Sequence, residues 1–317
     1  MRCTVCSISS SAPNADVTGT DRMKKTRGIS NLRTARTGNV YEIIRKEEMA
    51  NGSVIRFDIR APNIADKIKP GQFVIIRTHE GGERIPLTVA DKDSERGTIA
   101  IIFQVVGKTT ALMRSLDRGD GLRDVAGPLG LPSDLKNVGT AVVVGGGTGV
   151  AILHHITKGL RESGNRIVGI IGAKSSDFLI LKDEMEDLCD ELIITTDDGS
   201  VGIHGFVTQP LEELLKSGEE INEVFAIGPI VMMKNVASLT KPYGIKTVVS
   251  LNPVMIDGTG MCGCCRVIID GKMKFCCVDG PEFDGHTVDF EKLMLRNSMF
   301  QNEERESILS SISLRGH

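Results

Sequence analysis

From residue 138 onward the sequence repeats one arrangement, a short apolar run followed by a segment with helical spacing, and this repetition limits the possible folds more than any other feature. Apolar runs that predict buried strands occupy residues 140–144, 167–171, 192–196, 223–227 and 246–250. Helices are expected between them at residues 150–161, 181–189, 209–216 and 232–239. Strands that alternate with helices form a parallel sheet with helices on both faces, so residues 137–255 are predicted to form a doubly wound α/β domain.

A glycine-rich turn joins the first strand and the first helix of this domain, and it consists of Gly145, Gly146, Gly147, Thr148 and Gly149. Glycines let backbone amides approach a pyrophosphate at the positive N-terminus of a helix, so we predict a dinucleotide site here. The second strand ends in Gly172-Ala173-Lys174 and not in the acid that would bind the adenosine ribose of NAD. Lys174 is either a ligand of the 2′-phosphate of NADP or an ordinary solvated lysine, so NAD(H) and NADP(H) are both candidate cofactors.

Residues 39–136 follow a different pattern, in which short alternating strands are separated by turn signals such as Asn51-Gly52. Strands are expected at residues 40–46, 54–60, 72–78, 84–90 and 98–106, with one short helix at 109–116. Many short strands at this spacing predict an antiparallel β barrel. Two of its motifs have the residues to bind a phosphate and a ring heteroatom, namely Arg84, Pro86, Leu87 and Thr88 in the first and Gly107, Thr109 and Thr110 in the second.

Five of the eight cysteines lie between Cys262 and Cys277, and this clustering indicates a metal site in place of a disulfide framework. From Asp257 the spacing is D-x4-C-x2-C-x11-C. A plant-type [2Fe–2S] site opens with C-x4-C-x2-C, so the segment matches that opening with Asp257 in the position of the first cysteine. Zinc is the alternative, although the adjacent Cys276 and Cys277 of a strand would point to opposite faces and chelate one ion poorly.

The turn signal Asp270-Gly271 predicts a β hairpin within this segment. Pairing of apolar face with apolar face places Cys265 and Cys277 on the same side of the hairpin. Cys276 then falls on the other side with Lys272 and Lys274. Cys265 and Cys277 are therefore the expected ligands from the hairpin, and Cys276 is an expected bystander.

Composition and charge exclude several classes of function. The net charge is 38 − 41 = −3 and tryptophan is absent, so nucleic acid is not an expected ligand. No apolar run reaches the roughly 18 residues that a membrane span needs. Residues 1–38 carry more basic than acidic residues and are rich in serine and threonine, which is typical of a flexible extension or of a targeting peptide. A cytoplasmic protein is expected in the first case and an organelle-matrix protein in the second.

Five motifs occur in one order and together resemble a known family, and they occupy residues 84–88, 145–149, 195–200, 227–233 and 257–285. A barrel followed by a nucleotide-binding domain resembles the ferredoxin-reductase flavoproteins, whose first domain holds FAD and whose second holds NAD(P)H. Over about residues 39–296 the chain resembles the small subunits of NADH-dependent ferredoxin:NADP oxidoreductases, also called sulfide dehydrogenases. The electron-transfer subunits of NAD-dependent dihydroorotate dehydrogenase are close relatives and are kept as the alternative.

The resemblance implies an oxidoreductase subunit that contains FAD and a [2Fe–2S] cluster and exchanges electrons with NAD(P)H. The cluster ligands of the small-subunit family, one Asp and three Cys, correspond to Asp257, Cys262, Cys265 and Cys277. In the dihydroorotate relatives the first ligand is a cysteine, so Asp257 argues against that branch. The family usually has an aromatic residue at the position of Pro86, which implies a different packing against the flavin here.

The expected partner is a larger iron–sulfur flavoprotein subunit in a heterodimer, with ferredoxin reached through that subunit. The residues expected near the nicotinamide are Asp197, Asp198, Gly199, Gly228 and Pro229, although a solvated turn is the alternative for the two aspartates. The cluster segment is expected to form a small hairpin module at 256–285, followed by a tail at 286–317. A zinc-stabilised regulatory protein that binds a nucleotide without redox turnover is the alternative from another functional class.

Two pairs of neighbouring residues are expected to be structural. His154 and His155 lie in the first helix of the α/β domain, where adjacent side chains point in different directions, and they are expected at the surface or in packing. Met232 and Met233 begin another helix and are expected in the core.

Overall fold

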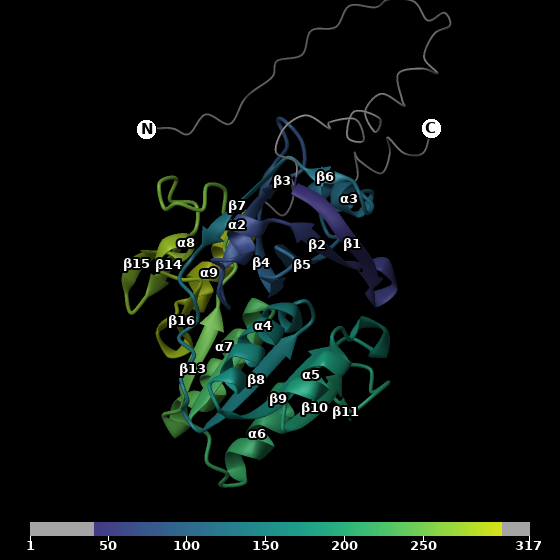
Figure 1. The fold of residues 1–317 in the computed structure, drawn as a ribbon. Helices are drawn as coiled ribbons and strands as arrows, with labels where there is room; N and C mark the ends of the chain where they lie inside the picture. The colour runs from purple at the N-terminus through teal and green to yellow at the C-terminus, as the bar shows by residue number, and fades with distance from the viewer. Residues whose placement is uncertain (1–40, 300–317) are drawn as a thin grey trace, which may run out of the picture. The chain divides into compact units, whose positions relative to one another are not determined.

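The structure is a computed structural model that describes residues 41–299, and the extension predicted at residues 1–38 lies outside the described residues. These residues form two seven-stranded sheets and one two-stranded hairpin (Figure 1). The predicted fold class, a β barrel followed by an α/β domain and a small C-terminal module, is confirmed. No helix between residues 41 and 299 has the length and apolar character to cross a membrane.

The first sheet is the barrel, in which the strands follow the order β6-β1-β2-β5-β4-β3-β7 and every neighbouring pair is antiparallel. Inward-facing residues form an apolar core in which the rings of Phe57 and Phe103 pack edge to face at 5.3 Å. The helices α2 (Pro62–Ala65) and α3 (Lys108–Arg114) connect barrel strands. The strands are β1 (Tyr41–Met49), β2 (Val54–Arg60), β3 (Phe73–Arg77), β4 (Arg84–Asp93), β5 (Thr98–Gln104), β6 (Gly121–Leu122) and β7 (Asp124–Leu129).

The second sheet follows the order β11-β10-β9-β8-β12-β13-β16, and all its pairs are parallel except that of β13 with β16. Ala141 and Val143 of β8 pack on the face covered by α4 and α5, whereas Val142 and Val144 pack on the face covered by α6 and α7. The strands are β8 (Thr140–Gly146), β9 (Arg166–Ala173), β10 (Glu191–Thr196), β11 (Ile203–His204), β12 (Glu223–Ile227), β13 (Lys246–Ser250) and β16 (Glu282–Asp284). The helices are α4 (Gly149–Glu162), α5 (Lys182–Leu188), α6 (Thr208–Lys216) and α7 (Ile230–Thr240).

The cysteine-rich segment forms the hairpin of β14 (Arg266–Ile269) and β15 (Lys272–Phe275). Asp270 and Gly271 at its turn both have positive φ, 49° and 70°, as a two-residue hairpin turn favours. The short helix α8 (Cys276–Asp279) follows, and β16 then pairs with the edge strand β13. Residues 286–317, which were expected to form a tail, include the helix α9 (Phe290–Asn297).

Candidate functional site

A cavity of about 840 Å³ lies at the carboxyl ends of the parallel strands, between the second sheet and the barrel. It lies at the point where β9 and β12 extend to opposite sides of β8, which is where open α/β sheets bind their ligands. The residues lining it that the sequence singled out are Thr88, Gly146, Gly147, Thr148, Gly149, Lys174, Asp197, Gly228 and Pro229. The structure therefore brings the predicted dinucleotide turn and Thr88 of the first barrel motif to one cavity.

The glycine turn is shaped by close backbone approach. A Cβ atom on Gly149 would lie 2.2 Å from the carbonyl oxygen of Ile227, and a Cβ on Gly146 would lie 2.6 Å from Sδ of Met232. Gly147 has a φ of +54°, and a Cβ there would meet nothing within 4 Å. The turn thus leaves open space in front of the N-terminus of α4, and this cradle fits the diphosphate of a dinucleotide.

Other predicted residues of this domain lie beside the cavity lining. Gly145 packs beneath α4, where a Cβ would lie 3.0 Å from Leu153. Asp198 accepts a hydrogen bond from the amide of Ser200 at 3.0 Å, and bonds from Ser200 lower the pKa of the Asp198 carboxyl. The carboxylate of Asp198 is therefore bonded within its own turn, whereas Asp197 lines the cavity. Met233 is buried in the core as expected, and Met232 is partly buried against that core and also lines the cavity.

The barrel motifs lie in β4 and at the start of α3. Thr88 lines the cavity, while Pro86 and Leu87 pair with Ile75 and Val74 in the β3–β4 ladder. Arg84 is exposed, and its guanidinium forms no hydrogen bond or ion pair with another residue between 41 and 299, so it is available to an anion.

At the second motif, the amide of Gly107 donates to Oγ1 of Thr110 at 2.9 Å, which caps α3. The hydroxyl of Thr109 donates to the carboxylate of Glu83. Both hydroxyls of this motif therefore hold the α3 turn and its neighbouring loop in place, and anion binding by the amides at the start of the helix stays a prediction.

Two cysteines meet at the base of the hairpin. The sulfurs of Cys265 and Cys277 lie 3.1 Å apart, both side chains are buried, and the amide of Cys277 donates to Sγ of Cys265 at 3.4 Å. Burial raises the pKa of the Cys277 thiol to about 12. The two thiols lie together as expected, but the predicted hairpin register was wrong, because Val267 pairs with Lys274 and Ile269 with Lys272. Cys277 reaches Cys265 from α8 and not from the paired strand. The role of both thiols as ligands stays a prediction.

The predicted orientation of Cys276 was wrong. We expected Cys276 on the side of Lys272 and Lys274, but its side chain is fully buried and its sulfur lies 3.4 Å from the carbonyl oxygen of Leu251. The reason is that β15 ends at Phe275 and Cys276 begins α8, so the alternation of a strand no longer applies. Burial also raises the pKa of Cys276 well above its usual value, which suits a structural thiol.

The other two predicted ligands lie in the glycine-rich loop before β14. Asp257 accepts hydrogen bonds from the amide of Thr259, at 3.1 Å, and from its hydroxyl. Cys262 is exposed, and a hydrogen bond from the amide of Cys264 lowers the pKa of its thiol. Within residues 41–299 no three His, Cys, Asp or Glu side chains lie close enough to hold a metal ion. The donor set of three thiols and one carboxylate still fits an iron–sulfur cluster.

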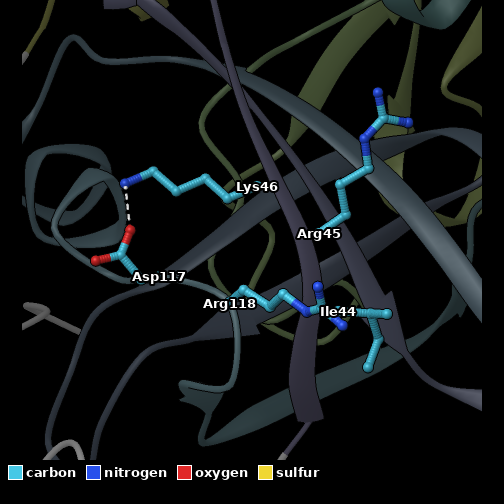
Figure 2. A pocket seen from close by; sticks show the side chains of 5 residues that line it. All are labelled: Ile44, Arg45, Lys46, Asp117 and Arg118. Carbon is cyan, nitrogen blue, oxygen red and sulfur yellow. Dashed lines mark hydrogen bonds and ion pairs between the residues drawn. The ribbon is translucent and has the colours of Figure 1, made fainter.

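A second hollow of about 580 Å³ lies on the barrel away from these sites (Figure 2). It is lined by Ile44, Arg45, Lys46, Asp117 and Arg118, and Lys46 forms an ion pair with Asp117 at 3.1 Å. Because Lys46 is already paired with Asp117 and no predicted site residue lines this hollow, we assign the hollow no role.

Some lining residues have no signal in the sequence. Phe178 and Phe206 reach the cavity from the segments after β9 and β11, and both are partly exposed there. The sequence does not indicate that these segments share one cavity, because this depends on which strand ends lie side by side in the sheet. Arg296 of α9 likewise donates to the carbonyl of Cys264 at 3.0 Å, across a separation of 32 residues.

Comparisons with known proteins agree with this geometry. A family model described as the iron–sulfur cluster binding domain of dihydroorotate dehydrogenase B matches residues 252–289. A Thermotoga maritima protein named as a dihydroorotate dehydrogenase B (NAD(+)) electron transfer subunit homolog is 45% identical over 266 residues, which cover 84% of this chain and 93% of that protein. The corresponding subunit of Fusobacterium nucleatum is 32% identical over 231 residues, or 70% of this chain and 87% of the relative.

Among solved structures, one described as an NADH-dependent reduced ferredoxin-NADP oxidoreductase superposes with a TM-score of 0.82 at 43% identity. The match covers 87% of this chain and 99% of the other. A ferredoxin NADP+ reductase of Neisseria gonorrhoeae, solved with bound FAD and NADP, has a TM-score of 0.52 at 18% identity and covers 64% of this chain and 90% of its own. That second likeness concerns the fold alone.

Proposed function

Because this chain belongs to the family of dihydroorotate dehydrogenase B electron transfer subunits and their homologues, we propose that it moves electrons between NAD(P)H, FAD and a [2Fe–2S] cluster. It is an electron-transfer subunit, and the proposed partner is a larger iron–sulfur flavoprotein subunit. Flavin accepts hydride as two electrons and releases them singly to a cluster, which is the chemistry that this pair of groups supplies.

The observation that supports the proposal most strongly is the shared cavity. The glycine turn at the start of α4 and Thr88 at the middle of β4 line the same space of about 840 Å³. A dinucleotide whose diphosphate lies on the turn and a flavin held by β4 can therefore bring their reactive rings together there.

We assign the residues of this chain as follows. The unpaired Arg84 binds the FAD diphosphate together with the α3 start at Gly107, Thr109 and Thr110, and Pro86, Leu87 and Thr88 border the flavin ring. The turn from Gly145 to Gly149 holds the NAD(P) diphosphate. The nicotinamide side is formed by Asp197, Gly228 and Pro229, which line the cavity, together with the adjacent Asp198 and Gly199. The cluster ligands are Asp257, Cys262, Cys265 and Cys277.

The residue at the first ligand position separates the two branches of the family. Asp257 favours the ferredoxin:NADP oxidoreductase type, and a dihydroorotate dehydrogenase subunit is the second candidate because its iron–sulfur domain matches residues 252–289. Reconstitution of this chain with each type of larger subunit, followed by NADH-dependent reduction assays, distinguishes the two. We also propose a cytoplasmic location, which cell fractionation tests against an organelle matrix.

The experiment that tests the function is a visible spectrum with metal analysis of the purified full chain. We expect flavin bands over a broad iron–sulfur absorbance, and bleaching of the flavin on anaerobic addition of NADH or NADPH. Cys265→Ser should lose the cluster, whereas Cys189→Ser, which alters a half-buried thiol at the end of α5, should keep it. A colourless protein that contains zinc would overturn the proposal and favour the regulatory alternative.

A further inference from the structure

Two buried histidines join the candidate dinucleotide turn to the candidate flavin strand. Nδ1 of His154 lies 3.3 Å from the carbonyl oxygen of Ala90, and Nδ1 of His155 lies 3.1 Å from that of Val89. The two side chains are 9% and 4% exposed. The expectation that they lie at the surface or in packing is confirmed for packing, and although the two residues are adjacent on α4, each ring contacts β4.

The strand offers these carbonyls because its regular pairing changes there. The ladder of β4 with β3 ends at Thr88, and a bulge lies between Val89 and Asp91 in the ladder with β5. A bulge leaves backbone groups without ladder partners, and α4 covers them. Lys158, about one turn further along α4, extends the contact through an ion pair with Asp91 at 3.2 Å.

The two hydrogen bonds fix the position of α4 along β4, which the apolar contact between the helix and the barrel does not. Ala90 and Ile102 of the barrel pack against Val150 and Leu153 of α4, but apolar packing has little directional preference. Two bonds to successive carbonyls fix how far α4 lies along β4. Burial lowers the pKa of His155, so its ring is neutral at pH 7 and donates through Nδ1.

We propose that His154 and His155 are positioning residues that hold the glycine turn of α4 at a fixed distance from Thr88, so that the nicotinamide and the flavin ring meet. The helix begins at Gly149, five residues before His154, and the two carbonyls directly follow Thr88 in β4. The inference rests on the proposed function, since it assigns the two cofactors to the two ends of this contact.

The test uses the full chain with FAD and cluster bound. In His155→Leu and in the double variant His154→Leu/His155→Leu, flavin reduction at saturating NADH should slow by about 10- to 100-fold, the loss expected for a misplaced reactive pair. The long-wavelength charge-transfer absorbance of nicotinamide stacked on flavin should weaken in the same variants. FAD content and the Kd for NADH should stay at the wild-type values.

Conservative and control variants separate positioning from stability. His155→Asn keeps a donor near the position of Nδ1 and should restore both the rate and the absorbance, whereas His155→Gln moves the donor outward and should not. His286→Leu removes a partly buried histidine that bonds Thr240 at 3.0 Å in the other half of the domain, and it should leave both readouts unchanged. If His155→Leu fails to fold, His155→Gln provides the same comparison.

Two results would overturn the proposal. One is a His155→Leu or His155→Gln protein that reduces flavin at the wild-type rate with the wild-type charge-transfer band. The other is a variant whose only defect is loss of FAD or weaker NADH binding. Failure of the proposed function itself is distinguishable, because the wild-type protein would then lack flavin or show no reduction by NADH or NADPH.

Discussion

Glu282→Gln is expected to stabilise the protein at alkaline pH, because Glu282 is a carboxyl enclosed between both halves of the chain. It lies in β16, opposite Ser250 of β13, and accepts a hydrogen bond from the hydroxyl of Ser133 at 2.6 Å. The turn at Gly71 closes over it, since a Cβ there would lie 2.8 Å from the carboxyl oxygen. Burial, and to a lesser degree Glu223, raises the pKa of Glu282 from 4.5 to about 7.

The sign follows from the two pKa values. Below pH 4.5 the carboxyl is neutral in the folded and the unfolded chain, so it carries no penalty. Between pH 4.5 and about 7 the unfolded chain ionises first, and the free energy of unfolding falls as the pH rises. Above about pH 7 the loss is constant and on the order of 3 kcal/mol, since each pKa unit corresponds to about 1.4 kcal/mol.

Glutamine keeps the shape and an acceptor for Ser133 but never ionises. Urea unfolding midpoints measured from pH 5 to pH 8.5 should therefore decline less for Glu282→Gln than for the wild type, with the largest gap above pH 7. Glu95→Gln neutralises an exposed carboxyl on the turn between β4 and β5 and should follow the wild-type curve. Equal stability of Glu282→Gln and wild type at pH 8, or parallel curves, would refute this reasoning.

Three further substitutions test the assigned sites. Arg84→Ala should weaken FAD binding by about 1.5–3 kcal/mol, because a phosphate loses a charge-assisted bond; wild-type flavin content after gel filtration, with Arg96→Ala as the control, would contradict this. Gly147→Val should block flavin reduction by NADH in stopped flow, because its side chain enters the open cradle, whereas Gly218→Val at a similarly positive φ should not. Asp257→Cys should still assemble a cluster, with a changed EPR spectrum and potential; a wild-type EPR spectrum in Asp257→Ala would instead exclude Asp257 as a ligand.

Local patterns were sufficient to predict the main strands and the glycine turn between β8 and α4. The apolar run of β8 and the helical spacing of α4 report burial on a sheet and on a helix face, and both are properties of consecutive residues. The same holds for the turn at Asp270-Gly271, whose positive φ values follow from the residue types. The proximity of Cys265 and Cys277 was expected from a register that proved wrong, because Val267 pairs with Lys274 and Cys277 approaches Cys265 from α8.

Contacts between distant segments were decided only in three dimensions. The strands β6 and β16 are too short to show an alternating pattern in the sequence. Their places in the two sheets are set by pairing with distant residues, Tyr41 for β6 and Val249 for β16. Cys276 turned inward because β15 ends at Phe275 and Cys276 begins α8. His154 and His155 both bond to β4 because a bulge more than 60 residues away in the chain exposes two carbonyl groups. Neither the sequence of the helix nor that of the strand alone indicates hydrogen bonds between such distant segments.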